Sequence, residues 1–201
     1  MRASPLLLAA VLCAASIGTG FAQTPTHPAS ASKVNPKIPA SMSFVYDAQH
    51  DQINAAGVQL KPALAANAVA PTTGTIAVTI TINVASHFSR GTTYHCSLTA
   101  LGGEIDTDNA TIAGGIETAN GLGKWTGPGA LTCTLNIPYS WTIPADPSAD
   151  TGLILAFGVS AVTAATPGAT GAVERSTLQL DGIENLPASG ATSTFAFGVT
   201  L

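Results

Sequence analysis

The sequence predicts an all-β protein built as an antiparallel sandwich of two sheets. One observation is the strict alternation of apolar and polar residues over Thr75–Val84, the pattern of a strand with one buried face. Another is the spacing of such segments, because about seven of them follow one another at short intervals after residue 72. Parallel sheets need long, usually helical crossovers, and these intervals leave no room for them.

The first 22 residues are predicted to be a secretory signal peptide. Arg2 gives a positive start, Pro5–Ile17 is almost wholly apolar, and small residues precede a cleavage site after Ala22. The apolar run is too short for a transmembrane helix, and no later stretch reaches about 18 apolar residues. We therefore expect a secreted, periplasmic or cell-surface protein without a transmembrane span. Cleavage removes Cys13; a lipidated Cys13 and an N-terminal core helix are the alternatives.

Three further segments follow. Residues 23–40 contain four prolines and no apolar periodicity, which predicts a Pro-rich linker. Residues 41–71 are ambiguous, with one short strand expected at Met42–Tyr46. Residues 72–201 form the predicted sandwich domain.

Within that domain each element is justified by its own alternation or apolar run. After Thr75–Val84, strands are predicted at Thr92–Ala100, Ala130–Ile143, Leu153–Val162, Val173–Leu180 and Ser193–Leu201, with weaker ones at Ile116–Thr118 and Lys124–Thr126. Leu101–Ile112 is predicted to be a polar loop, closed by the glycine pair Gly114-Gly115.

The low content of charged residues argues against a nucleic-acid partner. Charged residues make up 9% of the chain, against about 25% in typical globular domains. From residue 71 onward the basic side chains are Arg90, Lys124 and Arg175, too few to neutralise a phosphate backbone. We expect a protein or glycan partner at the cell envelope and no nucleic acid. The oligomeric state is left open.

Two cysteines remain after signal-peptide cleavage, and they are predicted to form a disulfide. Cys96 and Cys133 each lie in phase with the apolar residues of their own strand, so both side chains should point into the core. The bridge would close a loop of roughly 38 residues and contribute about 3–4 kcal/mol on the chain-entropy model. A redox or metal role is the alternative, although His95 faces the other way and no Cys-x-x-Cys is present.

With inward cysteines on two strands and a tryptophan nearby, the chain resembles the immunoglobulin-like superfold. In immunoglobulin domains the buried tryptophan lies between the two cysteines on the third strand. Here Trp125 lies between them in a glycine-rich segment that looks like a loop, and Trp141 follows Cys133. The resemblance implies architecture alone: an immunoglobulin-like β-sandwich of about seven strands with one disulfide.

Trp125 and Lys124 are the candidate ligand-binding residues. An exposed aromatic ring in a glycine-rich segment, next to a basic side chain, is suited to binding sugars or peptides. Trp141 is expected in the core instead.

Asp106, Asp108 and Glu117 are the candidate metal ligands. Glu117 is the twelfth residue counted from Asp106, the spacing of a calcium loop, but Thr111 stands where such loops carry glycine. Calcium is the one cofactor considered, and a solvated acidic loop is the alternative.

No catalytic residue is assigned. The sequence contains no His-Glu-x-x-His, Gly-x-Ser-x-Gly or phosphate-binding glycine loop. A triad of serine, histidine and aspartate assembled in space stays open, because triads are recognised by geometry. We expect a non-enzymatic structural or interaction protein of the periplasm or cell surface; the alternative is a carbohydrate- or calcium-binding β-sandwich module.

The C-terminal segment Gly190–Leu201 resembles the alternating terminal strand of chaperone–usher pilins. Such secreted sandwiches pair a donor strand with an open sheet edge. The chain departs from pilins at Thr200, where they usually carry tyrosine, and its residues 23–40 do not alternate. The resemblance implies an edge that binds another strand; an ordinary terminal strand is the alternative.

Overall fold

A computed structural model describes residues 38, 42–60, 71–85, 87–89, 91–106, 111–143, 151–164, 171–183 and 186–201. Within these residues the secondary structure is entirely strand and turn, which confirms the all-β prediction. The described part contains no helix long and apolar enough to cross a membrane. The predicted signal peptide, and all of the predicted linker except Ile38, lie outside the described residues.

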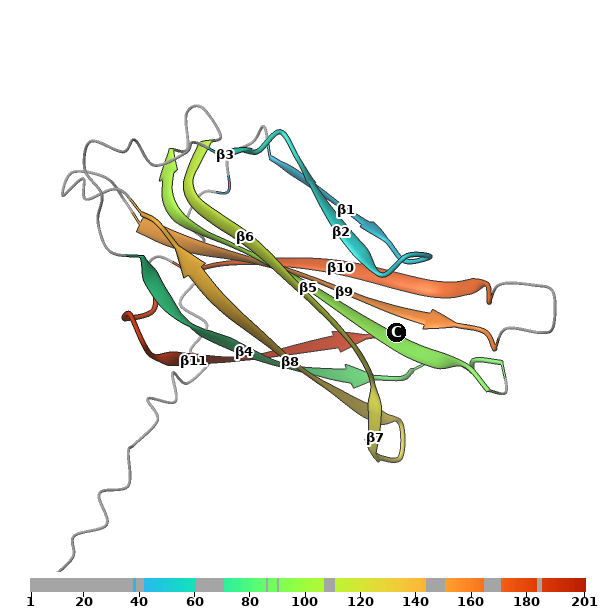
Figure 1. Ribbon diagram of the computed structural model, residues 1–201. Helices are drawn as coiled ribbons and strands as arrows, with labels where there is room; N and C mark the ends of the chain where they lie inside the picture. Colours follow the sequence, from blue (N-terminus) through green and yellow to red (C-terminus); the bar gives the residue numbers. More distant parts are fainter. Residues whose placement is uncertain are drawn as a thin grey trace, which may run out of the picture.

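Two sheets pack face to face, and a hairpin lies on the outer face of the larger one (Figure 1). The larger sheet has the order β10-β9-β5-β6-β3, and the smaller has the order β11-β4-β8-β7. The strands are β1 (Ser43–Asp47), β2 (Gln52–Ala56), β3 (Gln59–Leu60), β4 (Thr72–Asn83), β5 (Thr93–Asp106), β6 (Thr111–Leu122), β7 (Lys124–Gly127), β8 (Ala130–Trp141), β9 (Thr151–Val162), β10 (Val173–Ile183) and β11 (Thr192–Thr200).

The predicted polar loop Leu101–Ile112 is wrong, because most of it is strand. β5 continues to Asp106, and β6 pairs with it antiparallel without a register shift. The glycines of this segment do not mark a loop, because Gly102 faces Gly115 across the two paired strands. A Cβ at either glycine would overlap the indole of Trp141, so the glycines make room for that buried side chain in the core.

Two strand pairs are parallel, against the expectation of a wholly antiparallel fold. β11 pairs parallel with β4, and the two-residue β3 pairs parallel with β6. The described residues contain eleven strands. Eight of them lie in residues 72–201, where about seven were expected, and the other three lie in Ser43–Leu60, where one was expected.

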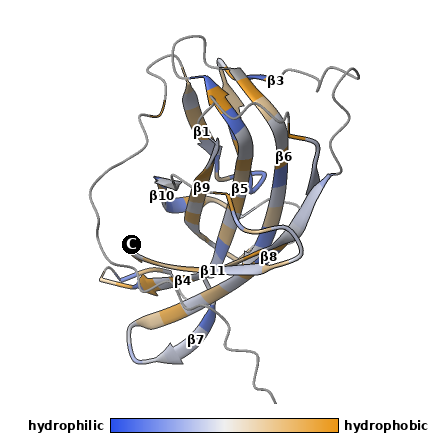
Figure 2. Ribbon diagram, turned by 90° about the vertical axis from the view of Figure 1, so that its left-hand side faces the viewer, coloured by the Kyte–Doolittle hydropathy of each residue, from blue (hydrophilic) through white to orange (hydrophobic). Residues whose placement is uncertain are grey.

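The main core lies between the two sheets, and the predicted disulfide crosses it. Inward residues of β4 and β8 alternate with exposed ones, as the period-two pattern requires, and Figure 2 shows hydrophobic colours recurring along β5, β8 and β9. Cys96 on β5 and Cys133 on β8 are bonded, with their Cα atoms 6.5 Å apart. The disulfide prediction is confirmed, and the bond joins one sheet to the other.

A second, smaller core lies on the other side of the larger sheet. The hairpin of β1 and β2 covers this outer face, where Met42 packs with Leu101, Ile112 and Ile154. Ten consecutive residues of β9 are buried, so both faces of this strand are covered. This is why its sequence is a nearly continuous apolar run. Within the ambiguous segment, β1 and β2 therefore form a third layer over the sandwich (Figure 1).

Candidate functional site

The C-terminal strand β11 forms one edge of the smaller sheet. It pairs with β4 over nine residues, from Thr192 opposite Thr75 to Thr200 opposite Asn83, with no register shift. Among the described residues no strand pairs with its other side. Within the described part of the chain, this side of β11 is therefore an open edge.

The backbone groups on that open edge can be assigned by alternation. Leu201 N donates to Asn83 O at 3.0 Å, and Ala191 O accepts from Thr75 N at 3.0 Å, so these odd-numbered residues face β4. In a strand, the N–H and C=O of successive residues point to opposite sides. The even-numbered residues therefore present their amides and carbonyls outward. They are Thr192, Thr194, Ala196, Gly198 and Thr200.

Proteins usually protect such edges with charges, proline, bulges or short strands, and β11 carries none of these. Its nine residues include no charged side chain and no proline, and its ladder with β4 is regular. The other edges differ. β10 carries Glu174, Arg175 and Asp181 and has a register shift, and β7 contains Lys124 and is also shifted. β7 pairs only with residues 130–132 of β8, and β3 pairs only with residues 111–112 of β6, so the rest of β8 and β6 are edges as well. These stretches contain a proline, Pro138, and a charge, Glu117.

The two faces of β11 have different character. Phe195 and Phe197 are partly buried and pack on the main core, and the Phe197 ring stacks on Phe157 of β9 at a centroid distance of 4.4 Å. The opposite face carries small side chains, and a Cβ added at Gly198 would meet nothing within 4 Å. An incoming strand would thus meet aromatic rings on one face and little bulk on the other.

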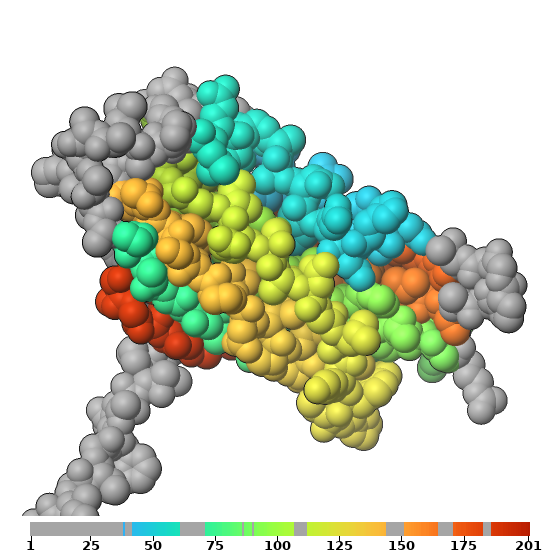
Figure 3. Space-filling model, viewed as in Figure 1, coloured from blue at the N-terminus to red at the C-terminus, as the bar shows by residue number. Residues whose placement is uncertain are grey.

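Trp125, predicted as a ligand-binding residue, is 59% exposed on β7. Its ring meets Tyr94 edge-on at a centroid distance of 5.7 Å, and Tyr94 meets Phe88 in the same way at 5.8 Å. The turn between β7 and β8 protrudes from the body of the molecule (Figure 3). Lys124 is exposed beside it. The pair therefore lies on the surface, in a short strand that matches the weak strand expected at Lys124–Thr126.

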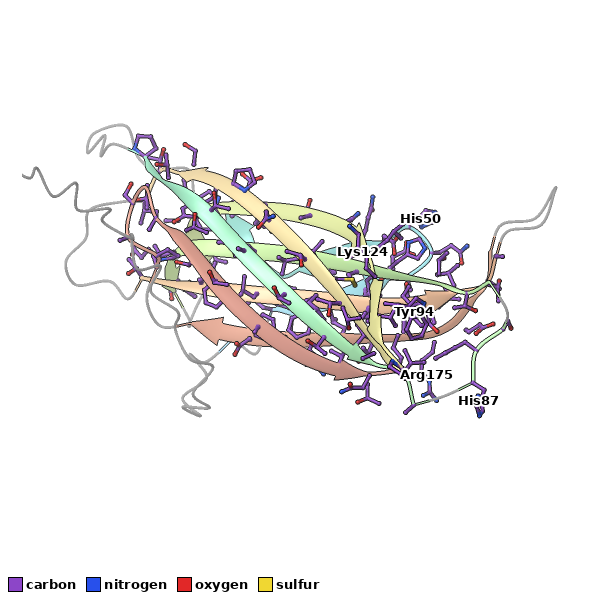
Figure 4. The ribbon with its side chains drawn as sticks, turned by 90° about the horizontal axis from the view of Figure 1, so that it is seen from below. His50, His87, Tyr94, Lys124 and Arg175 are labelled. Carbon is purple, nitrogen blue, oxygen red and sulfur yellow. A yellow bond between two sulfur atoms is a disulfide. The ribbon has the colours of Figure 1, made fainter. Side chains whose placement is uncertain are left out.

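Several charged or titratable side chains gather near these rings. Figure 4 shows His50, His87, Lys124 and Arg175 at the same end of the molecule as Tyr94. Burial raises the pKa of the Tyr94 hydroxyl above its ordinary value, and the negative charge of Glu174 raises it further. This end of the molecule thus combines aromatic and charged groups from several strands.

Two of the candidate calcium ligands, Asp106 and Glu117, lie far apart along the strands. In the ladder of β5 and β6, Asp106 lies opposite Thr111 and Glu117 lies opposite Ala100, six register positions further along. Six positions of a strand span about 20 Å. Asp108 lies outside the described residues. Within the described residues no group of three or more His, Cys, Asp or Glu side chains is arranged to hold a metal ion.

A polar cluster at the turn of the β1–β2 hairpin was not predicted. Asp51, in that turn, accepts a hydrogen bond from His95 Nδ1 on β5, with 2.5 Å between Nδ1 and Oδ2. Ser97 Oγ donates to the Asp51 carbonyl at 2.8 Å, and the Tyr46 hydroxyl donates to Asp51 Oδ1 at 3.2 Å. Asp51 has a φ of 52°, a left-handed conformation that aspartate tolerates better than most residues.

The cluster connects a carboxylate, an imidazole and a hydroxyl in a row. His95 Nε2 lies 3.0 Å from Thr93 Oγ1, and Thr93 is exposed. Such rows can orient a proton transfer. The same contacts also fasten the hairpin turn to the sheet, and Tyr46 reaches Ser160 Oγ on β9 at 3.1 Å. Burial raises the pKa of Tyr46, opposed by its hydrogen bonds to Ser160 and Ser97.

The local sequence gives little indication of the cluster around Asp51 and His95. Thr93 and His95 lie two residues apart and so share a face of β5, which is the only local signal. Asp51 is 44 residues away from His95, in a segment whose structure the sequence left open.

Comparisons with protein-family models, with curated proteins and with solved structures find no match to this chain.

Proposed function

We propose that the chain is an exported, non-enzymatic structural or interaction protein of the periplasm or cell surface, which binds a protein partner by strand addition at the open edge of β11. Unpaired backbone amides and carbonyls of an edge strand supply affinity for an extended segment, and pockets for alternate side chains supply selectivity. The observation that carries the proposal is the contrast between β11 and the other edges of the two sandwich sheets, each of which has a charge, a proline, a register shift or a length of only two residues.

Two further features support export. The N-terminal 22 residues have the composition of a signal peptide, and a disulfide between core strands suits an oxidising compartment. The immunoglobulin-like organisation is part of the same proposal, supported by a disulfide that joins two facing sheets.

The test is to express the full chain in an exporting host, identify the mature N-terminus by mass spectrometry, and measure the size of its envelope complexes. Ala196→Lys places a charge on the open edge, as natural edge strands do. Thr81→Lys is the matched control, because Thr81 is exposed on the same sheet in β4, which pairs with β11 on one side and with β8 on the other.

We expect the wild type and Thr81→Lys to form the same complexes and Ala196→Lys to lose them. Retention of the complexes by Ala196→Lys, or a mature chain that still carries residues 1–22, would contradict the proposal.

The exposure of Trp125 favours a second function, a carbohydrate-binding module. An indole held edge-on by Tyr94 offers its faces to the apolar side of a sugar ring, and Lys124 is next to it. Glycan-array binding that is lost in Trp125→Ala and kept in Ala196→Lys would support this function. Equal binding by Trp125→Ala and the wild type would reject it.

A further inference from the structure

We infer that the strand which pairs with β11 is the β11 of a second copy, antiparallel to the first and centred on Ala196. This inference rests on the proposed function and names its partner. It is carried by three properties of β11: the outward-facing backbone groups, the absence of charge, and the order of its side chains.

The backbone alternation fixes which residues can meet. Only even-numbered residues point their N–H and C=O groups to the open side, so an antiparallel pair must join even residues to even residues. A two-fold axis through Ala196 pairs Ala196 with itself, Thr194 with Gly198 and Thr192 with Thr200 of the second copy. Any other two-fold register leaves part of the nine-residue strand unpaired, so this one forms the most hydrogen bonds.

The two aromatic side chains of β11 also favour the register centred on Ala196. Phe195 of each copy comes to lie opposite Phe197 of the other, in a pair that makes no backbone hydrogen bonds. In such pairs the Cα atoms are about 4.5 Å apart, and aromatic side chains stabilise each other. Both rings are only partly buried in one copy, so pairing covers their remaining surface.

The outer face of β11, which carries the even-numbered side chains, leaves room for pairing with a second copy. Thr194 would lie opposite Gly198, where open space surrounds the position of the absent Cβ. Residues 192–200 carry no charged side chain, so two copies bring no like charges together. A symmetric interface requires such self-complementarity, because each residue meets the same patch that it belongs to.

Cysteine cross-linking of the full mature chain tests both the partner and the register. The paired Cα atoms of Ala196 would lie about 5.5 Å apart, within the range that a disulfide spans. Ala196→Cys should therefore form a covalent dimer under mild oxidation. In Thr194→Cys the two new thiols would be offset by about 13 Å along the strands, and dimer formation should be roughly tenfold lower.

Mixing Thr194→Cys with Gly198→Cys restores a direct pair and should restore the covalent dimer. Thr81→Cys, in the strand β4 that is paired on both sides, reports random collision of exposed thiols. Light scattering should give twice the chain mass for the wild type and the chain mass for Ala196→Pro. That substitution removes an outward N–H without breaking a bond to β4.

Efficient self-cross-linking of Thr194→Cys would overturn the register. A wild-type monomer with no cross-linking of Ala196→Cys would overturn the inference altogether. If envelope complexes sensitive to Ala196→Lys persist in that case, the edge binds a different protein and the proposed function stands. If those complexes are also insensitive to Ala196→Lys, both proposals fail.

Discussion

His95 Nδ1 on β5 lies 2.5 Å from Asp51 Oδ2 in the turn of the β1–β2 hairpin, and this contact fastens the outer layer to the sandwich. The two side chains are only about a quarter exposed, at 26% and 24%, so water screens the interaction less than it would at the surface. The neighbouring pair of Asp47 and His50 has a similar geometry, at 2.7 Å, but is far more exposed.

Asp51→Asn should loosen the hairpin without changing its backbone, because asparagine also tolerates a positive φ. The loss of a charge-assisted hydrogen bond should cost about 1.5–3 kcal/mol and raise the hydrogen-exchange rates of the β1 and β2 amides at least tenfold. Asp47→Asn is the control and should change these rates little, since it breaks an exposed pair. Equal effects of the two substitutions would show that Asp51 does not fasten the turn.

Tyr46→Phe should make stability less sensitive to alkaline pH. Burial raises the pKa of Tyr46 above its ordinary value of 10.0, so the folded protein retains the phenol proton longer than the unfolded chain. Stability is therefore fully present below pH 10 and falls as the pH rises toward the folded pKa. Urea unfolding between pH 8 and 11 should show a shallower decline for Tyr46→Phe, after a loss of about 1 kcal/mol at pH 8 from the missing hydrogen bonds.

Tyr94 and Tyr139 also have pKa values raised by burial, so part of the alkaline decline should remain in Tyr46→Phe. An unchanged slope would mean that Tyr46 does not contribute to it.

Gly115→Ala and Gly198→Ala should have opposite effects. A methyl group at Gly115 would overlap the indole of Trp141, and overpacking of this kind costs about 1–3 kcal/mol. At Gly198 the space is open, and replacing glycine within a strand should stabilise by up to about 1 kcal/mol. Thermal unfolding of the two variants measures both effects; a Gly115→Ala variant as stable as the wild type would contradict the packing described here.

Removing the disulfide should destabilise the sandwich strongly. The double variant Cys96→Ala with Cys133→Ala should lose about 3–4 kcal/mol, because the bond restricts the unfolded chain and joins the two sheets. Urea unfolding of the double variant should match that of the wild type under reducing conditions. A loss below about 1 kcal/mol would indicate that the bond constrains the unfolded chain little.

The sequence by itself determined the features that depend on local pattern. Ile76, Val78, Ile80 and Ile82 alternate with polar residues, and such alternation specifies a strand and its buried face wherever the strand pairs. The phase of Cys96 and Cys133 within their own strands was likewise enough to predict the disulfide. The candidate edge was also visible as an alternating terminal strand, Ser193–Leu201.

Only the tertiary structure decided the rest. The local sequence around Gly102 and Gly115 is typical of a loop. Both residues lie in strands, and glycine is needed there because the Trp141 side chain occupies the space beside them. The open edge of β11 follows from its parallel pairing with β4, and the Asp51–His95 contact joins residues 44 positions apart. Local periodicity fixes which way a side chain points along its own strand. Which strand lies beside it depends on contacts between distant segments, and these form only when the whole chain has packed.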